Sequence, residues 1–100
     1  MRRELTDRRH FAEQQLFGVQ RRLERARVAL EVVEHQLVAL SADALEQAAR
    51  RDQSETPVAD RACSAARERL ATMTVHEALA REAVLELERT KDELLDKLVG

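Results

Sequence analysis

The stretch LFGVQRRLERARVALEVVEHQLVAL, residues 16–40, decides the fold. Leucine recurs in it every seventh residue, at Leu16, Leu23, Leu30 and Leu37. A second apolar series with the same interval lies three residues after the first. Its members are Leu5, Ala12, Val19, Ala26, Val33 and Leu40. Two such series are the a and d positions of a heptad repeat, and they predict a long helix whose a/d seam packs against another helix.

The second half of the chain repeats this pattern. Its a positions are Cys63, Leu70, Glu77, Val84, Lys91 and Leu98, and its d positions are Ala59, Ala66, Met73, Ala80, Leu87 and Leu94. Glu77 and Lys91 are charged, and we expect their long side chains to reach solvent along their own methylene groups. The pattern predicts a second helix of similar length.

The segment RRDQSETPVAD, residues 50–60, separates the two patterns. Thr56 can cap a helix, and Pro57 suits the first helical position. We therefore predict one domain over residues 1–100, with a helix at about 4–51, a turn at 52–56 and a helix at 57–99. A short turn makes the helices antiparallel. The predicted fold class is an all-α, coiled-coil-like two-helix hairpin that completes a four-helix bundle by dimerisation.

Two features favour an alternative in which the helices are broken. Ser41 and Asp43 could cap a separate short helix, and Thr74 together with Glu77 matches the capping-box pattern. Breaks near Ser41 and Thr74 would give a compact domain of three or four helices.

The charge distribution supports a hairpin. Residues 1–27 hold eight Arg against four acidic residues, and residues 82–97 hold six carboxylates against three basic residues. A turn centred near residue 53 or 54 would make the numbers of opposed residues sum to about 107. That register places Leu23 against Val84 and predicts ion pairs of Arg21 with Glu86 and of Arg25 with Glu82.

We expect two sets of interface residues. The seam set is Leu16, Val19, Leu23, Leu30, Val33, Leu37, Leu40, Leu70, Met73, Val84, Leu87, Leu94 and Leu98. The partner set, which lies off the seam, is Phe11, Phe17, Val28, Val32, Leu79, Leu85 and Leu95. An apolar stripe wider than a coiled-coil seam is typical of a helix with more than one neighbour. The partner set therefore predicts a protein partner, a second copy or a different chain, near the open end of the hairpin.

The residues predict no catalytic apparatus, cofactor or metal. Cys63 falls in the seam, where it is expected to be a small buried residue, and a lone cysteine implies no oxidising compartment. The spacing of Glu31 and His35 lacks the Glu-x-x-His pattern of di-iron bundles. The sequence has neither a signal-peptide pattern nor a run of about 18 apolar residues, so we expect a cytoplasmic protein without a membrane span.

Nucleic acid is the main competing partner. The candidate contacts are Arg2, Arg3, Arg8, Arg9, Arg21, Arg22, Arg25 and Arg27, since arginine grips phosphate. However, the expected register pairs several of them with acids, and no aromatic residues are interleaved for base stacking. The sequence therefore disfavours nucleic-acid binding.

Three families share the outline of this chain, and we assign it to none of them. ELERTKDELLDKL, residues 86–98, is similar in composition to the C-terminal helix of the coiled-coil stalk proteins of flagellar and virulence-type export. The length and central bend resemble small secreted helical hairpins, although the bend reads DQSETP and not Trp-x-Gly. Asp52 and Glu55 resemble the acidic tip of the transcript-cleavage factors, which implies a polymerase-associated regulator.

The function that fits best is a non-catalytic protein–protein interaction or assembly module. It would act as a homodimer or as a subunit of a larger complex. The alternatives are a coiled-coil regulator associated with nucleic acid or RNA polymerase, and a hairpin associated with secretion.

Overall fold

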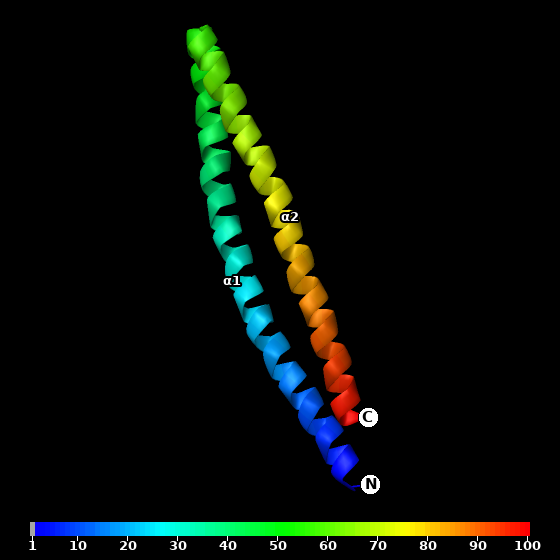
Figure 1. The fold of residues 1–100 in the computed structure, drawn as a ribbon. Coiled ribbons are helices and arrows are strands. Elements are labelled where there is room, and N and C mark those ends of the chain that lie inside the picture. The colour runs from blue at the N-terminus through cyan, green and yellow to red at the C-terminus, as the bar shows by residue number, and fades with distance from the viewer. Residues whose placement is uncertain (1) are drawn as a thin grey trace.

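A computed structural model of the protein describes residues 2–100, apart from the side chains of Arg2 and Leu5. Helix α1 spans Arg2–Ser54 and helix α2 spans Pro57–Val99, and the described residues form no strand. Figure 1 shows the two helices as an antiparallel hairpin with both termini at one end. The predicted all-α two-helix hairpin is therefore confirmed. The predicted seam position of Leu5 and the phosphate contact of Arg2 lie outside the described side chains.

The turn between the helices consists of Glu55 and Thr56 alone. Glu55 has a φ of 45°, in the left-handed region, and its N–H donates to the carbonyl of Arg51 at 3.0 Å. This hydrogen bond is the usual stop signal of a helix, although glycine normally occupies the left-handed position. The Thr56 hydroxyl then accepts from the N–H of Ala59 at 3.1 Å and caps α2, with Pro57 as its first residue. Helix α1 thus ends three residues later than the expected residue 51.

Both helices are continuous at the positions where breaks were considered. Helix α1 passes Ser41 and α2 passes Thr74 without interruption. The Thr74 hydroxyl donates to the carbonyl of Leu70 at 2.9 Å, within the helix, and does not cap a new one. The alternative of a compact three- or four-helix domain is therefore wrong.

The register of the helices differs from the expected one. The ion pairs that join them are Arg27–Glu88 at 3.5 Å, Glu34–Arg81 at 3.4 Å and Asp43–Arg69 at 3.1 Å. The residue numbers of these pairs sum to 115, 115 and 112, and the turn is centred between Glu55 and Thr56, so residues at equal height sum to about 111 and not 107. That shift is about one helical turn, at 3.6 residues per turn. The expected pairs of Arg21 with Glu86 and Arg25 with Glu82 are consequently absent among the described residues.

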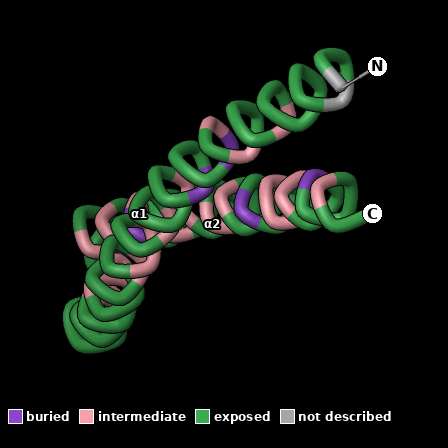
Figure 2. The backbone as a smooth tube through the Cα atoms, turned by 90° about the horizontal axis from the view of Figure 1, so that it is seen from below, coloured by how far each residue is buried: buried purple, intermediate pink, exposed green. Residues whose placement is uncertain are grey.

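The core is a thin strip between two rods. The Cα trace measures 78 × 15 × 14 Å, and the buried apolar residues are Val19, Leu23, Cys63, Ala66, Val84 and Leu94. In the predicted seam set, Val19, Leu23, Val84 and Leu94 are buried and the remaining residues are partly buried. Figure 2 shows these buried and partly buried positions recurring between exposed ones along both helices. A two-helix layer of this length leaves most of its surface in water.

Candidate interaction surface

Large apolar side chains are exposed along the whole hairpin. All seven residues of the predicted partner set are exposed, from 37% for Leu95 to 63% for Phe17. Five further residues share this property: Val38, Leu45, Val58, Val75 and Val99. Val58 and Val99 lie in the terminal turns of α2, and the heptad pattern does not mark either of them as an interface residue. A single exposed valine is ordinary, but twelve exposed large apolar residues beside six buried ones are unusual for a folded monomer.

These exposed residues do not form one stripe. Counted from the a positions, Phe11, Val32 and Leu79 occupy c positions, whereas Phe17 and Leu85 occupy b positions on the other side of their helices. The hairpin therefore has two long flanks, one containing positions b and e and the other containing positions c and g. The structure treats these flanks differently.

Side-chain ion pairs join the two helices along the b and e side, which we call the ion-paired flank. Arg27 of α1 pairs with Glu88 of α2. Arg81 of α2 lies 3.4 Å from Glu34 of α1 and 3.5 Å from Glu77 of its own helix. This contact explains the charged seam residue Glu77, whose side chain is 26% exposed and turns toward Arg81. Glu77 and Arg81 are an i, i+4 pair that the sequence alone could indicate, whereas the contact of Arg81 with Glu34 depends on the observed register.

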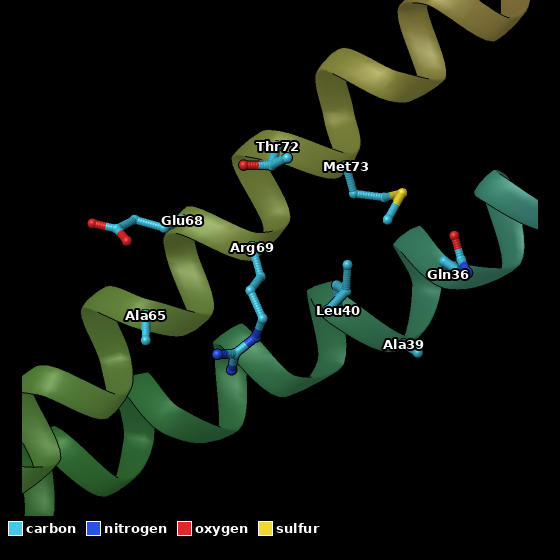
Figure 3. A pocket seen from close by; sticks show the side chains of 8 residues that line it. All are labelled: Gln36, Ala39, Leu40, Ala65, Glu68, Arg69, Thr72 and Met73. Carbon is cyan, nitrogen blue, oxygen red and sulfur yellow. The ribbon is translucent and has the colours of Figure 1, made fainter.

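Three hollows lie along the opposite side, which contains positions c and g and which we call the grooved flank. The largest has a volume of about 680 Å³ and is shown in Figure 3. Its lining is Gln36, Ala39 and Leu40 from α1, and Ala65, Glu68, Arg69, Thr72 and Met73 from α2. Figure 3 shows Arg69 reaching across from α2 toward α1. Its guanidinium binds Asp43 of α1 at 3.1 Å. The hollow therefore has an apolar floor and one ion pair at its end nearest the tip.

The other two hollows continue this flank toward the open end. One, of about 480 Å³, includes Gly18 and Arg22 of α1 with Thr90 and Glu93 of α2. The last, of about 610 Å³, is lined by Arg8, Arg9 and Phe11 of α1 together with Lys97, Leu98 and Gly100. Alanine, glycine and threonine leave these spaces because their side chains do not fill the angle between two helices.

Several charges at the open end of the grooved flank have no ion pair. Arg22 and Glu93 line the same hollow, and Arg25 and Glu86 lie near the same height on their helices. None of the four takes part in an ion pair within the described part of the chain. All four side chains are exposed. Opposite charges therefore stand along one flank without partners.

The remaining arginines of α1 form a basic surface beyond the end of α2. Arg3, Arg8 and Arg9 are exposed, and Figure 1 shows that the first turns of α1 extend past the end of α2. Among the described residues, Arg9 pairs with Glu13 of its own helix, at 3.5 Å, and Arg21 lies 6.0 Å from the ring centre of Phe17. The surface has positive charge and two exposed phenylalanines, and Arg8 and Arg9 line the hollow of about 610 Å³ together with Lys97.

The groups considered for chemistry are scattered. Cys63 is fully buried, with 0% exposure, and the three histidines are exposed. Residues 2–100 contain no cluster of three His, Cys, Asp or Glu residues that could hold a metal ion. Asp52 and Glu55 are exposed at the tip, and Asp52 pairs with Arg51 at 3.6 Å. Within the same described range, no helix has the length and apolar character needed to cross a membrane.

In comparisons with known proteins, no family model matches the chain, and neither a curated protein nor a solved structure matches it.

Proposed function

We propose that this chain is a non-catalytic protein–protein interaction module that acts as a homodimer, two coiled-coil-like hairpins forming a four-helix bundle in the cytoplasm. The observation that carries the proposal is the contrast between six buried apolar residues and twelve exposed large ones. Burial of apolar surface is the main favourable term in folding and association, about 25 cal/mol per Å². A second hairpin that packs along one flank supplies part of the burial that one hairpin lacks.

The shape of the molecule supports the same proposal. A rod with a 78 Å long axis presents a long, regular surface on which another helix pair can pack at about 20° over many turns. The grooved flank offers hollows to receive side chains, whereas a catalytic site would need a deep pocket with converging polar groups. Every hollow described here is open and lies on the surface of the rod.

Light scattering coupled to gel filtration tests this proposal. Across a concentration series, we expect the mass to approach twice the 11.4 kDa of one chain. A constant mass of one chain at all concentrations, with the helical circular dichroism signal retained, would contradict the homodimer. A different protein would then be the partner of the exposed residues.

The exposed arginines of α1 favour one second candidate, a nucleic-acid-associated hairpin. Lysine and arginine contacts with phosphate release counterions, so such binding weakens steeply as salt rises. Retention of a labelled duplex or single strand at low salt, and its loss at higher salt, would support this candidate. Replacement of Arg8 and Arg9 with Gln should then reduce retention, while replacement of Arg50 with Gln near the tip serves as the matched control.

A further inference from the structure

We propose that the second copy docks on the grooved flank, with the two tips at the same end of the bundle. This inference rests on the proposed homodimer and adds the face and the orientation. The partner is a second copy of this chain because the grooved flank holds basic residues on α1 and acidic residues on α2, so two copies of this flank attract each other.

The ion-paired flank is already occupied by its own side chains. Arg27, Glu34, Arg81 and Glu88 join the helices there, and each of these side chains is about half exposed. A docking helix would have to strip water from these charges or break the pairs, and desolvation of an ion pair costs free energy. The grooved flank has one ion pair between the helices, Asp43–Arg69, and one within α1, Glu46–Arg50, and both lie near the tip.

The middle of the grooved flank is apolar. Val32 of α1 and Leu79 of α2 are 51% and 58% exposed and lie at the same height, since their numbers sum to 111. Ala29 and Ala83 lie one turn away on the same side of their helices. If the twofold axis runs along the hairpin, Val32 of each copy meets Leu79 of the other. The alanines leave room for the two hairpins to approach closely.

The charges select the orientation. In a tips-together dimer, Arg22 and Arg25 of one copy face Glu86 and Glu93 of the other, because residues at equal height meet across the axis. None of these four side chains takes part in an ion pair within the described part of the chain. In the opposite orientation, with the two rods fully overlapped, they would lie opposite the stretch of the flank that contains Val32, Ala39 and Leu79, where no acidic or basic partner meets them. Complementary charges across an interface fix the register and exclude wrong arrangements.

Charge reversal tests the face. One variant combines Arg22→Glu with Arg25→Glu, and a second combines Glu86→Arg with Glu93→Arg. Each alone should raise the dissociation constant of the homodimer at least about tenfold, because like charges then face each other. An equimolar mixture of the two variants should form a heterodimer whose dissociation constant is close to the native one. Circular dichroism at equal concentration checks that each variant remains helical.

Glu24→Arg with Glu31→Arg is the matched control, since both residues are exposed b positions on the other flank of α1. It should leave the dissociation constant unchanged. If the control dissociates the dimer and the grooved-flank variants do not, the inference is wrong while the homodimer stands. If the native chain is a monomer throughout, the proposed function fails with it.

Energy transfer between labelled tips tests the orientation. Gln53 is exposed beside the turn, and Gln53→Cys in a Cys63→Ala background gives one labelling site per chain. A mixture of donor- and acceptor-labelled chains should show strong transfer when the tips lie together. With opposed tips, the labels would be separated by a distance approaching the 78 Å length of the rod. Absence of transfer in a sample with the mass of a dimer would overturn the tips-together arrangement.

Discussion

Leu23 is the large aliphatic residue with the least exposure, at 1%, and it lies near the middle of the seam. We expect Leu23→Asp to unfold the hairpin or dissociate the bundle, because an unpaired carboxylate would be placed in an apolar layer. The cost should be several kcal/mol, a large part of the 5–15 kcal/mol that stabilises a typical domain. Circular dichroism should show loss of helix at a temperature where the native chain is folded.

Val38→Asp is the control for this substitution. Val38 lies in the same helix but is 72% exposed, so the new carboxylate remains in water. Its effect on the free energy of unfolding should stay within about 0.5 kcal/mol. Equal loss of helix in both variants would show that burial in the seam does not determine the stability of the hairpin.

Glu55 is a second residue whose local geometry makes a prediction. Its φ of 45° costs a residue with a Cβ roughly 1–2 kcal/mol, whereas glycine adopts this conformation without strain. Glu55→Gly should raise the free energy of unfolding by about 1 kcal/mol. This is the net gain, because the larger conformational entropy that glycine loses on folding cancels part of the relieved strain. Glu55→Ala removes the same charge and keeps the Cβ, so it should give no such gain in a chemical denaturation experiment.

Around the turn, the sequence predicts the start of α2 but not the end of α1. The start of α2 follows from Thr56 and Pro57 because capping and a fixed proline φ are local effects. The end of α1 does not, because Glu55 in the left-handed region is an uncommon choice and no glycine marks the stop. Residues 52–54 are polar and were expected in the turn, yet they continue the helix.

At the scale of the helices, heptad spacing predicted two long rods because it depends only on neighbouring residues in one element. The register was wrong because it depends on the centre of the turn, and moving that centre by two residues moves every opposed pair by four. Surface ion pairs did not correct the error, since each is worth only about 0–1 kcal/mol and many alignments offer some. Arg81 illustrates this, because its contact with Glu34 becomes evident only in the observed register, whereas Glu77 is its i, i+4 neighbour in α2.

Gly18 gives a prediction at the same scale. It lies inside α1, and a Cβ added there would meet nothing within 4 Å. Gly18→Ala should therefore stabilise the helix by about 1 kcal/mol, since glycine in a helix interior costs that much relative to alanine. Thermal unfolding of the native chain and the variant at one protein concentration measures the gain.

The reciprocal substitution, Ala42→Gly, is the matched control on the same helix. Ala42 is exposed and occupies an f position, which belongs to neither flank. It should lose about as much stability as Gly18→Ala gains. A loss of stability in Gly18→Ala would instead point to a partner that packs closely against this glycine.

At the scale of the whole molecule, the sequence predicted a surplus of apolar residues but not the face they serve. Phe11 and Phe17 are both near the open end, which made that end the expected interface, yet they occupy opposite flanks. The distinction between the flanks arises from contacts between α1 and α2, such as Arg27–Glu88, and from the hollows on the other side. Those contacts and hollows depend on the alignment of α1 with α2, so the periodic pattern of one helix could not predict them.

The final prediction concerns the stability of the assembly. If folding and dimerisation are coupled, the midpoint of thermal unfolding must depend on concentration, because mass action favours the associated state. A hundredfold increase in concentration adds about 2.7 kcal/mol, which corresponds to a rise in Tm of roughly 5–10 °C for two 100-residue chains. The chain that combines Arg22→Glu with Arg25→Glu should show a lower Tm and a weaker dependence at the low end of the range. A Tm that is independent of concentration in the native chain would mean that the 78 Å rod is stable alone, and that its exposed apolar residues serve another partner.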